Sequence, residues 1–339
     1  MRVGITFNLK SDYSEPPEAP EDWLEEFDEE STIDAIRKAL VSLGFQTVLI
    51  GGGKRAVSFF VKRKVDWVFN IAEGQGSLAR ESHIPALCEL MGIPYTFASP
   101  QTLALCLHKY HTKLVLKSFG VPVPKGFLCP RGEVPFTPPL PFPLIVKPCA
   151  EGSSKGLGAR SVCRDRSELV HEVRRVWENY RQPVLVEEFV SGREITVAVL
   201  GNKSNAEILG WMEILPRNQD APFFVYHLEC KRNWKTQVEY VYFPALTRRE
   251  ETLLKRYALR AYRVTGCRDA ARLDFRLDSQ GIPRLLDVNP LPGLNPEHSD
   301  LPLIAFSRGM DFPQLIGRIV YEALQRYPQI ARFALRNSL

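Results

Sequence analysis

The sequence predicts an α/β protein that also contains α+β elements and is organised as more than one domain. Residues 2–71 alternate strand-like and helix-like patterns in the order β-α-β-α-β, which is typical of a parallel sheet with right-handed crossovers. A proline-rich stretch, 121–143, has the composition of a linker. Two later stretches, 144–162 and 272–289, place extended runs around a glycine-bearing turn, as β-hairpins do. A chain of 339 residues also exceeds one simple core.

Composition and charge favour a soluble globular protein with an anionic ligand. The chain is 45% apolar and 24% charged. No apolar run approaches the ~20 residues that span a bilayer, so we expect no membrane association. Residues 15–30 carry nine acids and no base, and because the whole chain has a net charge of +5, the remainder sums to +14. That excess suits a polyanion such as a nucleotide.

Two further features of the composition bound the function. Nucleic acid is disfavoured as a partner, because no dense Lys/Arg tract with interleaved aromatic residues occurs. Seven scattered cysteines without a CxxC pair predict reduced thiols in a cytoplasm.

The N-terminal third contains the elements of the predicted parallel sheet. Residues 2–7 have the pattern of a first core strand rather than of a signal peptide, and an acidic, proline-bearing insertion follows at 10–28. After it we expect, in order, a helix capped by Ser31 or Thr32 and ended by Gly44, a strand at 46–50, a turn at 51–53, a helix at 57–64 and a strand at 66–71. The loop that begins at Ala72 lies at the carboxyl end of a strand, where open α/β sheets bind ligands.

The rest of the chain continues with helices and longer strands. The pattern predicts helices at 80–91, 100–118, 167–180, 248–265 and 312–327, and strands at 184–190, at 194–200 and from 207 through Glu229-Cys230-Lys231. Lys109 and Lys113 share one face of the 100–118 helix, a spacing that is usual for solvated lysines.

A glycine-rich loop after the proline-rich stretch is the first candidate binding site. An apolar run ends in Lys147, and three glycines, two serines and two lysines fall within residues 147–158. Backbone N–H groups, hydroxyls and ammonium groups in such a loop suit phosphate oxygens. An extended run from about Ala159 follows instead of a helix, which indicates a hairpin flap over a phosphate rather than a P-loop or a Rossmann loop. An ordinary flexible surface hairpin is the alternative, and the loop alone does not separate the two.

The later hairpin predicts a metal site. Its strands alternate polar and apolar residues, and counting from the turn places Asp274 across from Asp287. Because side chains two apart in a strand share a face, Asn289 joins Asp287, and Arg272 joins Asp274. Two facing carboxylates with a carboxamide favour a hard divalent cation, Mg²⁺ or Mn²⁺. The alternative is an exposed hairpin face that Arg272 and Arg276 bridge.

Taken together, these motifs resemble a known superfamily. In order along the chain they are a lysine-ended strand, Glu-Gly-Ser-Ser at 151–154, Val-Leu-Val-Glu-Glu-Phe-Val-Ser-Gly-Arg-Glu at 184–194, a lone lysine, Arg-x-Asp at 272–274 and Leu-Leu-Asp-Val-Asn-Pro-x-Pro-Gly at 285–293. This order is similar to that of the ATP-grasp superfamily and, within it, of the D-alanine–D-alanine ligases. The resemblance implies a Rossmann-like parallel sheet at 1–110, followed by two domains that clamp ATP, a lid domain at 111–192 and a C-terminal domain with the magnesium site at 193–339.

The resemblance also implies an activity and a role for each matching residue. The activity is ATP-dependent joining of a carboxylate to an amine through an acyl phosphate, with ADP and phosphate released. The positions that contact ATP are Lys109, Lys147, Ser153, Ser154, Gly156, Glu187, Glu188, Phe189, Val190, Glu194 and Lys231. The metal ligands are Asp274, Asp287 and Asn289, and the groups that act on the reacting atoms are Ser153, Arg272 and the Gly293 amide. Small amino-acid-like substrates are expected near Glu73, Arg232, His298 and Ser299, in a protein that the family implies is a homodimer.

Departures from the family pattern gather at the substrate end. The family's N-terminal glutamate loop is absent, and Asn8-Leu9-Lys10 and the acidic insertion stand in its place. The acids available there as substitutes are Glu25, Glu26, Asp28, Glu29 and Glu30. Glu73 stands where a histidine is usual, and Arg232 where a tyrosine is usual. These changes suit a differently charged substrate.

Two alternatives to the joining of two D-alanines for the cell wall are therefore kept. One is an amino-acid or peptide ligase of secondary metabolism with substrates other than D-alanine, and the other is a nucleotide-binding homologue without turnover. Two candidate residues also have a purely structural alternative. Glu194 could pair only with Arg193, and His298 could be an ordinary surface histidine.

Overall fold

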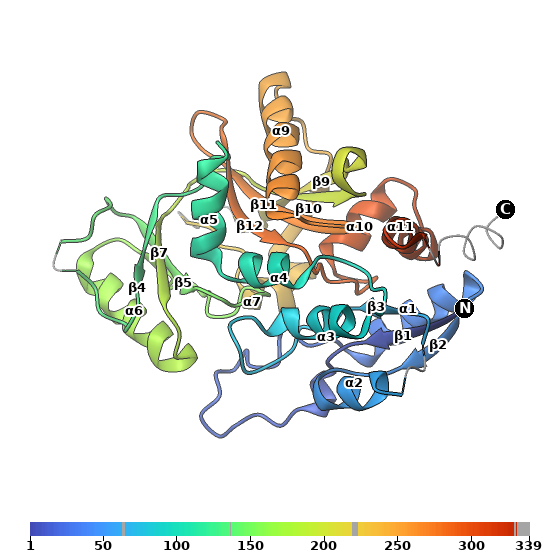
Figure 1. Ribbon diagram of the computed structural model, residues 1–339. Coiled ribbons are helices and arrows are strands. Elements are labelled where there is room, and N and C mark those ends of the chain that lie inside the picture. The colour runs from blue at the N-terminus through green and yellow to red at the C-terminus, as the bar shows by residue number, and fades with distance from the viewer. Residues whose placement is uncertain (63–64, 136, 219–222, 329, 331–339) are drawn as a thin grey trace.

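The described part of the chain folds into three β-sheets with helices packed around them (Figure 1). In this computed structural model the described residues are 1–62, 65–135, 137–218, 223–328 and 330. One sheet is parallel and two are antiparallel, which confirms the α/β class with α+β elements.

The N-terminal sheet is parallel, with strand order β2-β1-β3. Its strands are β1 (Arg2–Thr6), β2 (Gln46–Leu49) and β3 (Trp67–Asn70), and its helices are α1 (Glu30–Ser42), α2 (Gly53–Phe60) and α3 (His83–Met91), the last preceded by a 3-10 turn at Arg80–Ser82. Val3 and Ile5 of the central strand β1 are fully buried, because helices cover both faces of a parallel sheet. The predicted β-α-β-α-β order is thereby confirmed.

The second sheet is antiparallel, with strand order β4-β7-β5-β6. Its strands are β4 (Gly126–Cys129), β5 (Leu144–Pro148), β6 (Val162–Cys163) and β7 (Val184–Glu188). Helix α6 (Arg166–Tyr180) begins where the Asp165 side chain accepts a hydrogen bond from the Glu168 N–H, and it packs Leu169 and Val173 against the sheet. The glycine-rich loop joins β5 to β6, so the predicted hairpin is present.

The third sheet is antiparallel, with strand order β10-β9-β8-β11-β12. Its strands are β8 (Glu194–Leu200), β9 (Glu207–Pro216), β10 (Val238–Tyr242), β11 (Ala270–Leu277) and β12 (Pro283–Asn289). Helices α9 (Arg248–Thr265), α10 (Asp300–Ser307) and α11 (Phe312–Gln325) pack around it. α9 begins in a capping box, in which Thr247 and Glu250 satisfy each other's backbone N–H groups.

Two expected elements differ from the structure. The single helix expected at 100–118 is broken at His108, whose ψ is 88°, into α4 (Pro100–Leu107) and α5 (Lys109–Ser118). The His108 side chain caps the second helix, so Lys109 is the first residue of α5. Lys231 lies not in a strand but in α7 (Leu228–Arg232), a short helix capped by His227 and followed by α8 (Trp234–Gln237).

Two helix boundaries in the N-terminal part also differ. α1 begins at Glu30 without a side-chain cap, and Thr32 Oγ1 instead accepts a hydrogen bond from the Asn295 side chain at 3.0 Å. The helix expected at 57–64 begins earlier, at Gly53, and residues 63–64 of that expectation lie outside the described residues.

The N-terminal and third sheets share one continuous apolar core, whereas the second sheet has its own. Buried side chains from Val3 and Phe69 to Met212 and Leu315 belong to one cluster. A separate cluster joins α6 to β5 and β7. The boundaries after residues 110 and 192 stay a prediction, and Leu116, Val121 and Val123, which lie within the expected lid domain, pack in a core cluster of the third sheet and α9.

A buried carboxylate, Asp269, ties distant segments together. Its side chain is 0% exposed. It accepts hydrogen bonds from the Phe97 N–H at 2.6 Å and the Asn202 amide at 3.1 Å, and it forms an ion pair with Arg326 at 2.7 Å. Arg326 also donates to the Tyr95 carbonyl at 2.9 Å. The segment before α4, the start of β11 and the end of α11 therefore meet at one charge.

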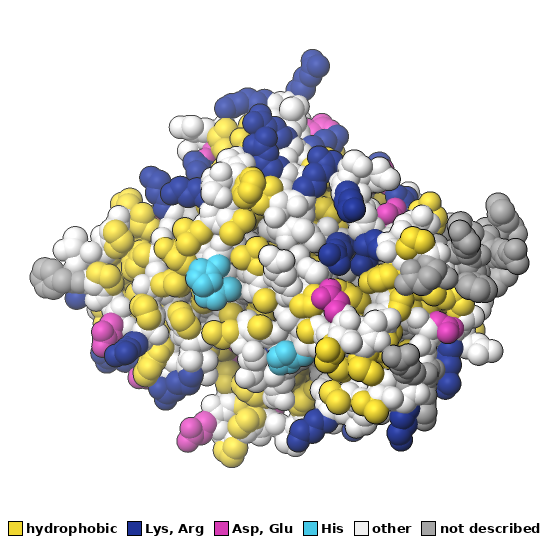
Figure 2. All heavy atoms as spheres, viewed as in Figure 1, with side chains coloured by type: hydrophobic (Ala, Val, Ile, Leu, Met, Phe, Trp, Pro, Cys, Tyr) yellow, Lys and Arg dark blue, Asp and Glu magenta, His cyan; other side chains and the backbone are white. Residues whose placement is uncertain are grey.

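The surface carries much of the positive excess that the sequence contains. Figure 2 shows Lys and Arg side chains gathered over α9, at the top of the view, and the sequence of this helix supplies Arg248, Arg249, Lys255, Arg256, Arg260 and Arg263. Across the described residues, every helix is too short or too polar to cross a bilayer.

We predict that Arg326→Met lowers the free energy of unfolding by about 3 kcal/mol or more, because removal of one partner leaves a buried charge uncompensated. Urea unfolding followed by circular dichroism measures the change. Arg318→Met is the matched control: it removes a half-exposed arginine that pairs with Glu207 and Glu322, and we expect a loss below about 1 kcal/mol. Equal losses in the two variants would contradict a special role for Asp269.

Candidate active site

Two adjoining cavities lie between the sheets. The lysine cavity, named for Lys109, Lys147, Lys155 and Lys231 in its wall, has a volume of about 120 Å³ and lies between the second sheet and the β11–β12 hairpin. The acidic cavity has a volume of about 460 Å³ and is named for Glu25, Glu26, Asp28, Glu29, Glu73 and Asp300 in its wall. Ser153, Lys231 and Arg272 line both cavities, so the two meet at these side chains.

The lysine cavity brings together most of the positions that the sequence predicts for ATP. They are Lys109, Lys147, Ser153, Ser154, Glu187, Glu188, Phe189, Val190, Glu194 and Lys231. Gly156 lines neither cavity, and its N–H donates to the Asp22 carboxylate at 2.7 Å. Glu194 pairs not with Arg193 but with Arg276, at 2.7 Å.

A buried glutamate between two lysines sets the charge of this cavity. Glu187 is 1% exposed and contacts the ammonium groups of Lys113 and Lys147, the latter at 2.7 Å. Burial by itself would raise the pKa of Glu187, but the charges of Lys113 and Lys147 outweigh it and hold this pKa below its ordinary value. Burial lowers the pKa of Lys113 to about 7. Lys147 and a partly protonated Lys113 together carry more than one positive charge against one carboxylate, which leaves a positive site for an anion.

Lys109 connects α5 to the hairpin. Its ammonium group lies 2.8 Å from Asp287 Oδ2, and its backbone N–H donates to the Cys149 carbonyl at 2.9 Å. Burial would lower the pKa of Lys109, but the charge of Asp287 raises it above its ordinary value. The first residue of α5 thus fixes both the root of the glycine-rich loop and one carboxylate of the hairpin.

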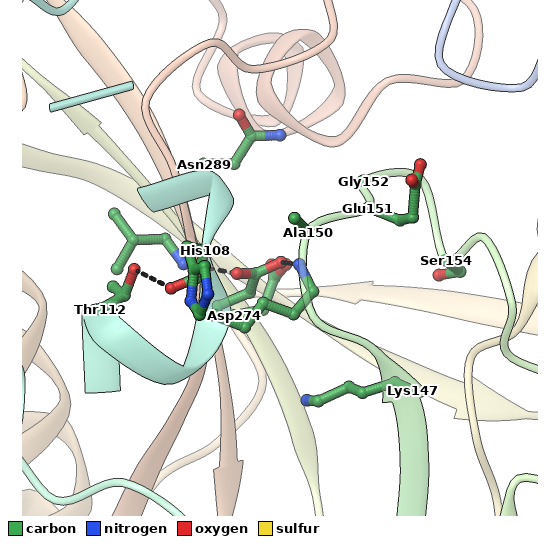
Figure 3. A network of polar contacts seen from close by, with 12 residues as sticks. His108, Thr112, Lys147, Ala150, Glu151, Gly152, Ser154, Asp274 and Asn289 are labelled. Atoms are coloured by element: carbon green, nitrogen blue, oxygen red, sulfur yellow. Dashed lines mark hydrogen bonds and ion pairs between the residues drawn. The ribbon is translucent and has the colours of Figure 1, made fainter. Parts of the chain in front are cut away.

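The glycine-rich loop is held in a strained conformation above the cavities. Ser153 and Ser154 have φ of 48° and 60°, and each non-glycine residue in this left-handed region costs on the order of 1–3 kcal/mol. Ser154 Oγ donates to the Tyr226 carbonyl at 3.0 Å, which fixes the loop against the segment before α7. Figure 3 shows the loop with Gly152 and Ser154 on one side of the site, Asp274 on the other, and Lys147 extending from β5 toward the hairpin.

The hairpin has the register that the sequence predicts. Asp274 lies opposite Asp287, and Arg272 lies opposite Asn289. Arg272 Nη2 contacts Asp274 Oδ2 at 3.0 Å, and Thr196 Oγ1 donates to Asp274 Oδ1 at 3.0 Å. Of the alternative, a face bridged by Arg272 and Arg276, only the Arg272 contact with Asp274 is present among the described residues, since Arg276 pairs with Glu194.

The donor set fits a hard divalent cation. Asp274 and Asp287 offer carboxylate oxygens, and Asn289 offers an amide oxygen that already accepts from the Leu291 N–H at 3.0 Å. Within the described ranges no group of three or more His, Cys, Asp or Glu side chains is arranged for a metal. A cation at this site would therefore take the Asn289 amide as its third protein ligand. Lys109, Lys147 and Lys113 outweigh burial and hold the pKa of Asp287 below its ordinary value, so this carboxylate is ionised at neutral pH.

The predicted substrate residues all line the acidic cavity. Glu73, Arg232, His298 and Ser299 lie in its wall together with the catalytic candidates Ser153, Arg272 and Gly293. Arg232 forms an ion pair with Glu25 of the acidic insertion. A Cβ atom at Gly293 would lie 2.9 Å from Ser299 Oγ, so a side chain there would require Ser299 to move.

The structure adds residues that the sequence analysis did not assign. Lys113 contacts Glu187, and its position four residues after Lys109 was the available signal. Asp300, at the start of α10, pairs with Arg272 at 3.2 Å. Buried Arg80 pairs with Glu26 at 2.7 Å and donates to the Ala150 carbonyl at 2.9 Å. Asp300 and Arg80 belong to no local motif, so spacing gave no signal for them.

A family model and sequence relatives both match this chain to D-alanine–D-alanine ligases. The model of the family described as D-ala D-ala ligase C-terminus matches residues 133–321. An uncharacterized protein of Sinorhizobium fredii, y4sG, is 32% identical over 341 residues, which cover 96% of this chain and 98% of that protein. The D-alanine–D-alanine ligase of Alcanivorax borkumensis is 34% identical over 293 residues, which cover 86% of this chain and 88% of that enzyme.

A solved structure shows the same fold. The crystal structure of D-alanine–D-alanine ligase from Bacillus anthracis complexed with ATP superposes with a TM-score of 0.74 at 20% identity, over 97% of this chain and 99% of that one.

We predict that Asp287→Asn weakens Mn²⁺ binding, measured by electron paramagnetic resonance of free Mn²⁺, by more than about tenfold. Even partners of metal ligands cost about 10–100-fold when removed. Asp278→Asn in the turn of the same hairpin is the control, because it keeps an oxygen that accepts from the Gln280 and Ile282 N–H groups, and its Mn²⁺ affinity should match wild type. Unchanged affinity in Asp287→Asn would remove this residue from the metal site.

Proposed function

Because this chain belongs to the D-alanine–D-alanine ligase family of ATP-grasp enzymes, we propose that it forms a peptide-type bond between two small amino-acid-like substrates. It is an ATP-dependent ligase by family. The reaction joins the carboxylate of one substrate to the amine of the other and releases ADP and phosphate.

The observation that carries the proposal is the meeting of the two cavities. The groups that suit a nucleotide line one cavity, the groups that suit an amino acid line the other, and Ser153, Lys231 and Arg272 belong to both. A reacting carboxylate at this junction is in reach of both a phosphate and an amine. A fold that had kept only nucleotide binding would not need this junction.

In the first step, an oxygen of the first substrate's carboxylate attacks the γ-phosphorus of ATP, and ADP leaves. Phosphoryl transfer needs alignment and neutralisation of charge more than covalent chemistry. Lys109, Lys147 and Lys231 supply positive charge along the phosphates, and the Ser153-Ser154 loop covers them. Mg²⁺ or Mn²⁺ held by the two hairpin carboxylates and Asn289 would neutralise further phosphate charge. The product is an acyl phosphate.

In the second step, the neutral amine of the second substrate attacks the acyl carbon. The carbonyl oxygen becomes an oxyanion, the bond from carbon to the phosphate oxygen then breaks, and phosphate leaves with that electron pair while the amine loses a proton. Arg272 and the Gly293 N–H are the donors aimed at the oxyanion, a role in which one donor is commonly worth about 3–4 kcal/mol.

The nucleotide base is assigned to the end of β7. Glu188, Phe189 and Val190 follow this strand in the wall of the lysine cavity. The Glu188 N–H and Phe189 N–H already donate to the Lys125 and Pro143 carbonyls. The carboxylate of Glu194, beside them, is assigned to the ribose hydroxyls.

Three further proposals accompany this function. The family implies a homodimer and a cytoplasmic location. The second candidate is a ligase of secondary metabolism with substrates other than D-alanine, because Glu73 and Arg232 differ from the residues that are usual in the family. The pairing of Arg232 with Glu25, where the family has a tyrosine, favours that candidate.

The test of the proposed function is a screen of ATP hydrolysis in Mg²⁺ across D- and L-amino acids, with phosphate release and product mass as readouts. We expect phosphate release to depend on the amino acid and a product whose mass is the sum of two substrates less one water. Phosphate release indifferent to every amine and carboxylate would overturn ligation.

We predict that Arg272→Met lowers kcat of amino-acid-dependent phosphate release by about 10²–10³-fold, because it removes a donor to the developing oxyanion. Arg284→Met is the control at the far end of the same hairpin, where the arginine pairs with Asp278, and its kcat should stay close to wild type. Full turnover in Arg272→Met would exclude the catalytic role of Arg272.

A further inference from the structure

Most carboxylates in the wall of the acidic cavity have a cation partner within the protein. Glu25 pairs with Arg232, and Glu29 pairs with Lys10 at 3.5 Å. Glu26 pairs with Arg80 at 2.7 Å and Lys155 at 3.7 Å, and Asp300 pairs with Arg272 at 3.2 Å. These pairs account for the carboxylates of the wall except at two positions.

The two exceptions are Asp28 and Glu73. Among the residues that the structure describes, neither side chain has an ion pair or a hydrogen bond to a cation. Burial and the neighbouring charge of Glu29 raise the pKa of Asp28 to about 7, although Lys10 opposes the shift. Burial raises the pKa of Glu73 well above its ordinary value, and the charges of Glu81, Glu26 and Asp28 add to this shift while Arg80 opposes it.

Backbone contacts fix both carboxylates on one wall of the cavity. Asp28 is the last residue of the acidic insertion and is bridged to the segment just after β1, since its N–H donates to the Asn8 carbonyl at 2.9 Å. Glu73 follows β3, and the next residue, Gly74, donates its N–H to Asn8 Oδ1 at 2.8 Å. Asn8 therefore holds the two loops side by side. Their carboxylates face the same space without a partner for either charge.

This wall adjoins the proposed reaction centre. Glu73 and Arg272 together line a small third cavity of about 40 Å³, which also includes Asp287 and Asn289. Glu73 and Arg272 thus lie in the wall of one small space, so an amino acid whose carboxylate contacts Arg272 can place its amine at Glu73. The acidic cavity is also larger than one small amino acid requires. Its volume of about 460 Å³ falls within the range of ~300–1,000 Å³ that is usual for pockets that bind drug-sized ligands.

We propose that one of the two ligated substrates is an amino acid with a positively charged side chain, and that Asp28 and Glu73 select it. This proposal rests on the proposed function. An amino acid with an uncharged side chain brings one ammonium group to two carboxyl groups that lack a cation partner, whereas a basic amino acid brings two cations. Each cation lowers the raised pKa of the carboxyl group that it contacts, so that this group ionises and pairs with it. Charge-assisted hydrogen bonds to both carboxylates are about twice as strong as neutral ones. A neutral side chain leaves one buried carboxylate desolvated and unpaired, and such mismatches cause strong discrimination.

The first experiment compares pairs of amino acids of similar shape that differ in side-chain charge. Isothermal titration of the protein loaded with Mg²⁺ and a non-hydrolysable ATP analogue measures binding of ornithine against norvaline and of arginine against citrulline, in both D and L forms. We expect the basic member of at least one pair to bind about 10²-fold more tightly. Equal or tighter binding of the neutral member in every pair would overturn the proposal. Because this measurement needs no turnover, it is independent of the phosphate-release screen that tests ligation.

The second experiment removes the two carboxylates while keeping their shape. Glu73→Gln and Asp28→Asn should each lower the affinity for the preferred basic amino acid by about tenfold or more and leave the affinity for its neutral partner unchanged. Glu30→Gln, at the exposed first residue of α1 and outside the cavity wall, should keep the wild-type preference. Glu73→Gln and Asp28→Asn each remove a carboxyl group that has no cation partner among the described residues, so we expect an unchanged or higher Tm. Loss of affinity for basic and neutral members alike would show a structural role instead and overturn the proposal.

A pH series adds a readout that a structural role would not move. Below pH 7 Asp28 is largely protonated and cannot pair with a cation, so affinity for the basic amino acid should rise as pH increases through about 7. The groups that face Asp28 are Lys10, Glu29 and Glu73, and those that face Glu73 are Glu26, Glu81 and Arg80. In Asp28→Asn only Glu73 still titrates, so the rise should shift away from pH 7, and an unchanged profile there would contradict the assignment of Asp28.

Discussion

Neutralisation of buried charge between elements that are distant in the sequence is the constraint on which the site depends. Lys109 at the start of α5 pairs with Asp287 on β12, Lys113 and Lys147 from two elements enclose Glu187 on β7, and Arg272 joins β11 to α10. A buried charge without a partner costs several kcal/mol, so each pair fixes the distance between the elements that carry it. The same surplus of cations that holds the elements together provides the attraction for a nucleotide.

The sequence predicts those parts of the molecule whose pattern is local. The hairpin that brings Asp274 opposite Asp287 follows from the alternating pattern and the short turn, although the register shifts by one residue between Phe275 and Asp274, where Leu286 is left unpaired. The flap follows from a lysine-ended strand and a glycine-rich loop. The short helix that carries Lys231 was missed, because five residues are too few for a helical period to be visible. The break at His108 was missed as well, since apolar periodicity continues across it.

The acidic insertion shows a different limit of prediction. Its composition marked it as unusual, but its partners lie far away in the sequence. Asp22 accepts the Gly156 N–H and the Tyr180 hydroxyl, and Glu26 accepts the Gly152 N–H. Its acids thereby engage two backbone amides of the glycine-rich loop, and Glu25 reaches α7. No spacing rule connects such a segment to its contacts, so only the folded chain reveals that the insertion walls the acidic cavity.

The division of the apolar core has a consequence for how reactants come and go. The parallel sheet and the five-stranded sheet are set in one shared interior, while the second sheet and α6 carry their own. The second sheet and α6 can therefore rotate relative to the other two sheets without exposing the apolar core that those two sheets share. Entry of a nucleotide and exit of a product would then be timed by a hinge in the proline-rich approach to β5 and in the turn after β7, while the carboxylates of the hairpin stay where they are.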